Sequence, residues 1–343
     1  TFEEIHRNGA IAFAIYNYHR FTEDYSYIPE KGLEVLIGIA RFWHQRVNFS
    51  DKNKYVMLGV TGPNEYENNI NNNWYTNYIA KWCIEYALKN IGIVKSDHIS
   101  DYIRIKQKVN FTDEELASWK NVADNMYFPY SEKHHVFLQQ DGFLDKELIT
   151  VADLDQSQRP INQKWSWDRI LRSPYIKQAD TLQGFYFFED HFTDEELERH
   201  FDFYEPFTVH ESSLSPCVHS IQAAKLNRME QAYEFYLRTS RLDLDDYNHE
   251  VEEGLHITSM AGTWMSIVEG FGGMRIVNNM LSFTPRIPKE WKSYSFKVNF
   301  RNQVITVNVS QNGTHFELEG KQEINILVNG EKIMVSPNNL LKV

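Results

Sequence analysis

A carboxylic acid on a rigid turn is the first feature of this sequence that could carry chemistry. The stretch Gly-Val-Thr-Gly-Pro-Asn-Glu-Tyr-Glu occupies residues 59–67, and its Gly-Pro pair restricts the backbone just before Glu65. The apolar residues 54–60 predict a strand that runs into this turn. Glu65 is therefore a candidate general acid. The spacing is equally compatible with Glu65 or Glu67 capping a helix that starts near Asn73.

A proton donor must hold its proton near neutral pH, which requires an apolar or aromatic setting around the carboxyl group. Tyr66, Trp74 and Tyr75 are available near Glu65 in the sequence. The chain contains 8 Trp, 19 Tyr and 22 Phe, and aromatic faces suit stacking against sugar rings. On composition alone, a large helical core rich in aromatic residues is the favoured explanation.

Two further segments could bind a small anion. Ser212 and Ser213 precede an expected helix start, where hydroxyl and backbone N–H groups can donate to an anion. An ordinary N-cap cluster has the same composition. His256 lies among small residues in Gly-Leu-His-Ile-Thr-Ser (254–259). As an imidazolium it could hold a phosphate oxygen, although a lone histidine is more often structural.

Lys177 and Gln178 stand side by side in the stretch Ile-Lys-Gln-Ala-Asp (176–180). Together they offer several hydrogen-bond donors, which suits a ring of sugar hydroxyls, although the start of a surface helix has a similar composition. We expect no metal site. His134 and His135 are adjacent, which is poor geometry for shared ligation, and no cysteine or carboxylate is spaced to join them.

The composition argues against several classes of function. The net charge is −12 and no stripe of lysine or arginine is present to meet the phosphates of a nucleic acid. No apolar run reaches the ~18 residues of a membrane span. Cys83 and Cys217 are too few for a disulfide framework and fit a reducing compartment. We expect a cytoplasmic protein that binds neither nucleic acid nor membranes.

Helices must position most of these residues. Apolar residues recur at helical spacing and predict helices over 3–19, 30–46, 74–89, 113–124, 194–200, 217–239 and 257–269. Long polar connections over 48–73, 125–168 and 201–216 join these helices, and loops of this length are uncommon unless they are functional. This organisation favours a toroid of paired helices whose loops form a pocket at one end.

The pattern changes after Pro285. Residues 297–300, 304–309 and 324–328 alternate apolar and polar side chains, as strands do, and Asn312-Gly313 and Asn329-Gly330 predict hairpin turns. We therefore expect a mainly α-helical catalytic domain over 1–284 and a small antiparallel β domain over 285–343.

Taken together, these segments resemble the inverting disaccharide phosphorylases of glycoside hydrolase family 65. The resemblance runs through the whole chain and is most specific at residues 59–67, at Lys-Gln-Ala-Asp (177–180) and at Glu-Gly-Leu-His (253–256). Residues 32–43 and 72–77 are most similar to the maltose phosphorylases of that family. The resemblance implies an (α/α)6 barrel that carries the active site, followed by a C-terminal β domain.

The resemblance also implies a reaction, in which maltose and phosphate give β-D-glucose 1-phosphate and glucose without a cofactor. Glu65 matches the general acid of the family, and Lys177 and Gln178 match residues that hold the transferred glucosyl unit. The phosphate site is matched by Ser212, Ser213 and His256. Phosphorolysis of trehalose, kojibiose or nigerose uses every one of these residues, so these disaccharides remain alternatives.

Phosphorolysis is consistent with these residue types. An inverting hydrolase needs a second carboxylate as a base that activates water, whereas phosphate is already an anionic nucleophile. A carboxylate would repel phosphate, while hydroxyl groups, backbone N–H groups and a histidine would bind it.

The family's N-terminal β-sandwich, its helical linker and the first helices of its barrel have no counterpart in this chain. We therefore expect the barrel to be incomplete at its N-terminus and activity to require that missing region. The family resemblance implies a homodimer. The alternative from a different class is a non-catalytic carbohydrate-binding or assembly fragment.

Overall fold

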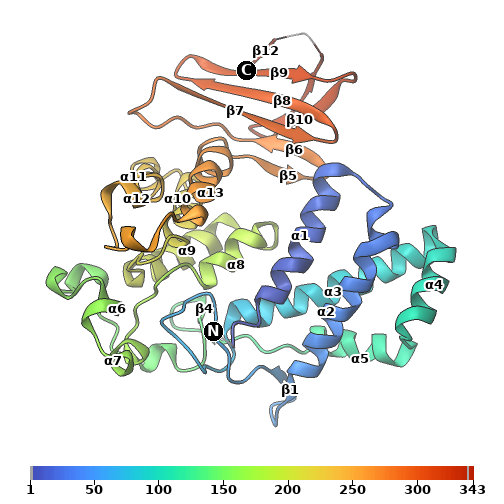
Figure 1. Ribbon diagram of the computed structural model, residues 1–343, viewed down its shortest axis with the longest axis horizontal. Coiled ribbons are helices and arrows are strands. Elements are labelled where there is room, and N and C mark those ends of the chain that lie inside the picture. Colours follow the sequence, from blue (N-terminus) through green and yellow to red (C-terminus); the bar gives the residue numbers. More distant parts are fainter. Residues whose placement is uncertain (1–2, 338–339) are drawn as a thin grey trace. The chain divides into compact units, whose positions relative to one another are not determined.

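The computed structural model describes residues 3–337 and 340–343 (Figure 1). Internal contacts divide the chain into two compact units. The first unit consists of Thr1–His19 and Glu23–Val209, and the second consists of Arg20–Thr22 and His210–Val343. The first is mainly helical, whereas the second combines helices with β-sheets.

The longer helices of the first unit are α1 (Arg7–Thr22, whose last three residues belong to the second unit), α2 (Leu33–Arg46), α3 (Trp74–Asp97), α4 (Ile99–Val109), α5 (Asp113–Asp124) and α9 (Asp194–Tyr204). The shorter ones are α6 (Ile161–Lys164), α7 (Trp167–Arg172) and α8 (Thr181–Phe187), with a π-helical turn η1 (Ile28–Gly32) and 3-10 turns η2 (Phe143–Asp145), η3 (Val151–Asp153), η4 (Gln156–Gln158), η5 (Glu189–His191) and η6 (Glu205–Phe207). Helices α2, α4, α5 and α8 all contact α3, which makes α3 the centre of this unit (Figure 1).

An aromatic stripe explains this central position of α3. Trp74, Tyr78, Trp82 and Tyr86 recur every four residues, so they share one face of the helix. Trp74 stacks on Tyr78 at 5.0 Å between ring centroids, and Trp82 stacks on Tyr86 at 5.1 Å. Many of the abundant aromatic residues therefore form the helical core, which is the favoured explanation from composition.

The predicted strand over 54–60 is wrong in length. Only β2 (Tyr55–Val56) is regular, and it pairs with the two-residue β1 (Asn48–Phe49). Val60 forms a separate bridge with Ile70. The intervening backbone instead bonds to side chains, because Met57 N–H donates to Asn72 Oδ1 at 2.9 Å and Gly59 N–H donates to Asn71 Oδ1 at 3.1 Å. A second short pair, β3 (Tyr130–Ser131) and β4 (Val136–Phe137), lies in the long connection after α5.

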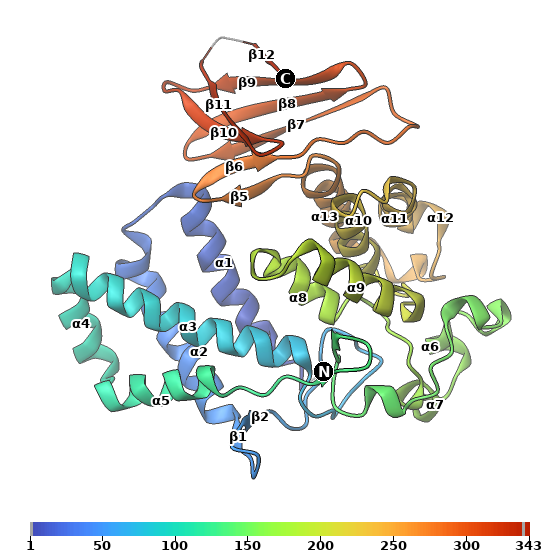
Figure 2. The ribbon, with the colours of Figure 1, turned by 180° about the vertical axis from the view of Figure 1, so that it is seen from behind.

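The helices of the second unit are α10 (Ser215–Lys225), α11 (Met229–Ser240), α12 (Leu242–Asp245) and α13 (Ile257–Met265), with the turns η7 (Val251–Glu253) and η8 (Ser266–Phe271). Figure 2 shows α10, α11 and α13 side by side. The single helix predicted over 217–239 is broken at Asn227, which adopts a left-handed φ of 59°. Asparagine tolerates this conformation, which ends a helix.

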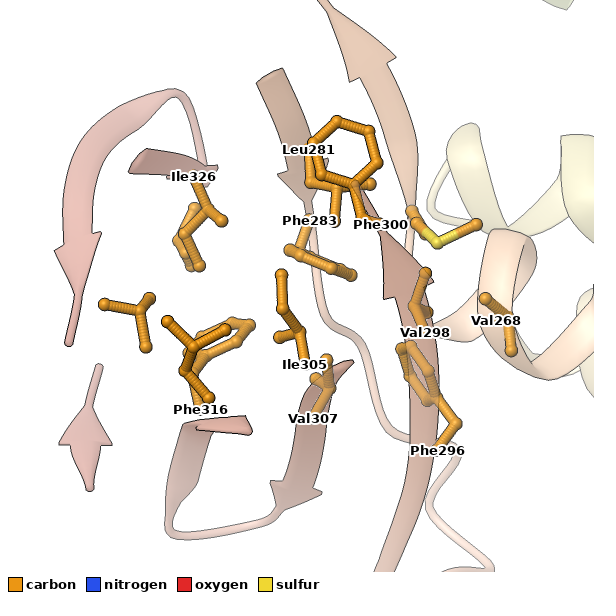
Figure 3. Packing of buried hydrophobic residues seen from close by; sticks show 14 of the residues in the cluster. Val268, Leu281, Phe283, Phe296, Val298, Phe300, Ile305, Val307, Phe316 and Ile326 are labelled. Carbon is orange, nitrogen blue, oxygen red and sulfur yellow. The ribbon is translucent and has the colours of Figure 1, made fainter. Parts of the chain in front are cut away.

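Two four-stranded sheets complete the second unit. One has the order β11 (Glu331–Val335), β10 (Ile324–Val328), β6 (Met280–Phe283), β5 (Arg275–Val277), and the other has the order β12 (Leu341–Lys342), β9 (Gly313–Glu319), β8 (Gln303–Ser310), β7 (Ser293–Phe300). Their buried side chains meet in one apolar core, in which Phe283, Ile305 and Phe316 are fully buried (Figure 3). Asn312-Gly313 and Asn329-Gly330 connect β8 to β9 and β10 to β11, as the hairpin signals predict.

The prediction of a mainly helical chain followed by a small sheet-rich domain is confirmed, with two differences in detail. Strands β10 and β6 pair in parallel, because the whole β7–β9 sheet lies between them in the chain and no hairpin joins them. Strands β5 and β6 also precede residue 285, the predicted start of the β domain. Among the described residues, no helix has the length and apolarity needed to cross a membrane.

Candidate active site

The structure places the Glu65 side chain against Lys177. Lys177 Nζ lies 2.6 Å from Glu65 Oε2, although the two residues are 112 positions apart. The exposed fractions of their side chains are 24% for Lys177 and 33% for Glu65. Two of the predicted site residues therefore meet at a position that solvent, and hence a ligand, can reach.

Asn64 aligns the two segments that carry this pair. Its Oδ1 accepts a hydrogen bond from Lys177 N at 2.9 Å and another from Tyr66 N at 3.2 Å. Its own backbone N–H donates to Asp180 Oδ2 at 2.9 Å. Asn64 is 1% exposed, so these bonds are shielded from competing water. The residue immediately before Glu65 is thus bonded to both ends of the Lys-Gln-Ala-Asp stretch.

Asp180 is bonded on both of its carboxyl oxygens. Besides Asn64 N–H, it accepts a hydrogen bond from Asn73 Nδ2 at 2.8 Å. Burial raises the pKa of Asp180 to about 7, while the hydrogen bonds from Asn64 and Asn73 act in the opposite direction. Asn73 also caps α3, because its Oδ1 accepts from Thr76 N at 2.8 Å. The helix cap is therefore Asn73, and the capping role considered for Glu65 or Glu67 does not occur.

Glu67 has a different structural role. It is buried, accepts a hydrogen bond from Gln140 Nε2 at 2.9 Å and forms an ion pair with Lys146. Burial lowers the pKa of Lys146 to about 8. These contacts attach the 59–67 segment to the long connection that follows β4.

The three aromatic residues expected around Glu65 have their packing in the core. Tyr66 belongs to an apolar cluster with Leu154, Ile161, Ile170, Tyr175 and Val209. Trp74 stacks on Phe137 and Phe185, and Tyr75 contacts His6 and Phe187 edge to face. The group that the structure shows against the Glu65 carboxylate is instead Lys177.

His6 is a neighbour of the turn that sequence reasoning did not single out. Its Nδ1 lies 3.2 Å from the carbonyl oxygen of Thr61. Burial lowers the pKa of His6 to about 4, partly offset by this hydrogen bond and by the charge of Glu65. A neutral imidazole therefore lies close to the turn that carries the candidate acid.

Gln178, which follows Lys177 in the chain, has an unsatisfied hydrogen-bond acceptor. The residue is 6% exposed, and its Oε1 has no hydrogen-bond partner within residues 3–337 and 340–343. Buried polar atoms normally have a partner, so each exception needs an explanation. A sugar hydroxyl that donates to Oε1 would satisfy it.

The three residues predicted for phosphate lie in the second unit. Ser212 Oγ accepts from Leu214 N at 3.2 Å just before α10, and Ser213 Oγ lies 2.8 Å from Thr258 Oγ1 on α13. His256 is the residue directly before α13. The Ser213–Thr258 contact joins the start of α10 to the start of α13, so both predicted anion segments belong to one local group of helix N-termini.

His256 is held by a carboxylate. Its Nδ1 lies 2.6 Å from Asp243 Oδ1, and its backbone N–H donates to Asp243 Oδ2 at 3.0 Å. Because a carboxylate only accepts, Nδ1 must carry the proton. The His256 N–H and ring keep the pKa of Asp243 below its usual range. The other nitrogen, Nε2, lies 3.9 Å from Glu250 Oε2, and Asp246 lines the same small hollow.

Comparison with known families matches both parts of the chain. The family model described as "Glycosyl hydrolase family 65 central catalytic domain" matches residues 1–265. The model described as "Glycosyl hydrolase family 65, C-terminal domain" matches residues 274–335.

Individual relatives agree with this match. The chain is 53% identical over 336 residues to the maltose phosphorylase of Bacillus subtilis, covering 98% of the chain and 44% of that protein. It is 39% identical to an alpha,alpha-trehalose phosphorylase of Thermoanaerobacter brockii, again covering 98% of the chain and 44% of the relative. The chain thus spans less than half the length of these relatives.

A solved structure has the same fold. It is described as "Putative kojibiose phosphorylase from human microbiome" and superposes with a TM-score of 0.90 at 35% identity. The match covers 98% of this chain and 49% of the other.

Proposed function

The chain belongs to glycosyl hydrolase family 65, and from this premise we propose that it carries the catalytic centre of a phosphate-dependent, inverting disaccharide phosphorylase that acts on maltose. The products are β-D-glucose 1-phosphate and glucose. The 53% identity to a maltose phosphorylase supports maltose over the substrates of the other relatives. Trehalose, kojibiose and nigerose are the alternative disaccharides.

The pairing of Glu65 with Lys177 carries this proposal. As general acid, Glu65 donates its proton to the glycosidic oxygen as the bond from that oxygen to the anomeric carbon breaks. The Lys177 ammonium group, 2.6 Å away, donates to the carboxyl group that must present this proton. Proton donation therefore requires Lys177 to find another acceptor, and a hydroxyl of the bound glucosyl unit provides one. Substrate binding would then free Glu65 to act as an acid.

Gln178 is assigned to the same glucosyl unit. Its buried Oε1 lacks a partner among the residues described, and a hydroxyl of the sugar supplies the missing donor. The cost of leaving this oxygen unsatisfied would favour ligands with a hydroxyl at that position over ligands without one.

Phosphate is the nucleophile in this proposal. One of its oxygens bonds to the anomeric carbon on the face opposite the departing sugar, which inverts the configuration. The proton that phosphate loses replaces the one that Glu65 gives to the leaving glucose, so the reaction is balanced without a cofactor. Ser212, Ser213 and His256 are the proposed phosphate ligands.

The test is a panel of maltose, trehalose, kojibiose and nigerose, each incubated with and without inorganic phosphate. Because the relatives are more than twice as long, the chain is assayed alone and together with the part of the Bacillus subtilis relative outside the matched segment. We expect glucose 1-phosphate from maltose only when phosphate is present. Equal cleavage without phosphate would show a hydrolase, and sugar binding without any turnover would show a binding fragment.

A matched pair of substitutions tests the assignment of the acid. Glu65→Gln keeps the size of the side chain but removes its proton, and we expect a loss of at least about 100-fold in kcat. Glu132→Gln makes the same change at an exposed residue of the first unit and serves as the control. Equal activity of the two variants would exclude Glu65 as the acid.

We also propose that the active protein is a cytoplasmic homodimer. Cys83 and Cys217 are both free and buried, which is consistent with a reducing compartment. Light scattering coupled to size-exclusion chromatography measures the oligomeric state, and a monomer in the active preparation would contradict this part of the proposal.

A further inference from the structure

The Asp180 side chain bonds to both the Gly-Pro-Asn-Glu turn and the N-cap of α3. Its Oδ2 accepts from the backbone N–H of Asn64, and its Oδ1 accepts from the side chain of Asn73. It is 2% exposed. A buried carboxylate is costly unless its oxygens are hydrogen-bonded, and here each oxygen accepts from its own donor.

The packing around this carboxylate is close. A Cβ atom added to Gly62 would lie 2.4 Å from both Asp180 Oδ2 and Asn73 Nδ2. Only a glycine therefore lets the turn approach the Asp180–Asn73 pair at this point. The backbone of the turn rests directly on these two side chains.

Asp180 can influence the acid from this position without contacting it. Asn64 lies between Asp180 and Glu65: its N–H is bonded to Asp180, and the next residue in the chain is Glu65. The side chain of Asn64 in turn holds the backbone of Lys177, three residues before Asp180. The two segments that carry Glu65 and Lys177 are thus joined by hydrogen bonds at one buried residue, Asn64.

We propose that Asp180 is a positioning residue for the reaction, which sets the geometry of Glu65 relative to Lys177 through Asn64 and Asn73. The inference rests on the proposed function, because it assumes that Glu65 is the proton donor. Asp180 acts through Asn64 and Asn73, to which it is hydrogen-bonded.

The test compares two substrates for the variant Asp180→Asn. Asparagine keeps the size of the side chain but offers only one acceptor oxygen, so either Asn64 N–H or Asn73 Nδ2 loses its partner. Maltose needs a proton on its leaving oxygen. In α-D-glucosyl fluoride the carbon–fluorine bond breaks as phosphate bonds to the anomeric carbon, and fluoride departs without a proton from an acid.

With maltose and phosphate we expect kcat to fall about 100-fold and KM to change little, because a misplaced general acid affects the transition state. With α-D-glucosyl fluoride and phosphate we expect kcat within about threefold of the unsubstituted protein. Equal losses on the two substrates, or unchanged activity on maltose, would overturn the proposal. Asp168→Asn, at an exposed aspartate of the same unit, is the control.

A second variant covers the case in which Asp180→Asn does not fold. Asn73→Ser retains a residue that caps α3 well but removes the Nδ2 donor to Asp180. We expect its kcat to fall with maltose and phosphate but to change little with α-D-glucosyl fluoride and phosphate.

Amide hydrogen exchange separates this inference from the proposed function. In Asp180→Asn we expect the Asn64 amide to exchange at least about tenfold faster, while amides in the middle of α3 remain protected. If the unsubstituted protein has no phosphorylase activity, the proposed function fails, and the exchange data alone decide whether Asp180 holds the turn. Unchanged exchange at Asn64 would refute that role.

Discussion

The environment of His256 has two opposite effects on the phosphate binding that we propose for this residue. Asp243 fixes the orientation of the ring through Nδ1, which favours binding. Glu250, 3.9 Å from Nε2, occupies the side on which an anion would bind. The negative charge of Glu250 would repel a phosphate anion that binds beside Nε2. Phosphate bound to His256 as we propose would therefore have to displace Glu250 or bind despite its charge.

We predict that Glu250→Gln lowers the KM for phosphate. Removal of a partly exposed charge changes binding by about 0.2–1 kcal/mol, which corresponds to a factor of about 1.5 to 5. Initial rates at fixed maltose and varied phosphate measure this change. Glu252→Gln, a neighbouring exposed glutamate, should leave the KM unchanged. An unchanged KM in Glu250→Gln would mean that this carboxylate does not face the phosphate.

At the scale of the element, α3 supports the site as well as the core. Its aromatic stripe packs in the helical core, while its N-cap residue Asn73 holds Asp180. The Gly62 turn packs on this same helix end. The stability of the helix start and the position of the turn are therefore coupled. Substitutions at two glycines separate the effect of close packing at the turn from the effect of helix propensity.

We predict that Gly62→Ala destabilises the protein by about 1–3 kcal/mol, because the added methyl group overpacks against Asn73 and Asp180. Gly92→Ala, within α3 but far from its N-cap, is the control. No atom lies within 4 Å of its added Cβ, so the better helix propensity of alanine should stabilise by about 0.5–1 kcal/mol. Urea unfolding measures the free energy of unfolding of both variants. Equal effects of the two substitutions would contradict the close approach at Gly62.

At the scale of the whole molecule, buried histidines make stability depend on pH. His200 is 1% exposed; its Nδ1 donates to the carbonyl of Glu196 at 2.7 Å and its Nε2 accepts from Phe137 N–H at 2.8 Å. Burial lowers its pKa to about 4 from 6.5. Between these values the unfolded state binds a proton that the folded state does not. Stability is therefore retained above pH 6.5 and lost as the pH falls toward 4.

We predict that His200→Gln removes part of this acid sensitivity. The shift in pKa corresponds to up to about 3 kcal/mol at pH 4 relative to pH 7. Asp180, whose raised pKa acts in the opposite direction over the same range, is present in both proteins and cancels in the difference. Urea unfolding at pH 7 and pH 4.5 measures the dependence, with exposed His135→Asn as the control. An identical pH dependence in His200→Gln would contradict the prediction.

Local signals in the sequence were sufficient for several elements. The helix over 113–124 is confirmed to the residue, because Thr112 caps it and three acidic residues follow. The strand over 324–328 is confirmed because its alternating residues end at an Asn-Gly turn. Helix α4 was missed, and the predicted strand over 54–60 was too long, because its backbone bonds to side chains that are distant in sequence.

The sequence by itself determined the family, the helical and sheet-rich parts, and Glu65, Lys177 and Gln178 as candidates, since residue types and short spacings are enough for these. Only the tertiary structure decided that Lys177 pairs with Glu65 and that Asp180 holds the turn. The packing of Tyr66 into the core is also tertiary, whereas Asn73 caps α3 through a local bond to Thr76 N. Contacts between residues more than 100 positions apart depend on how helices and loops pack together. No local pattern in the sequence specifies which of these distant residues meet.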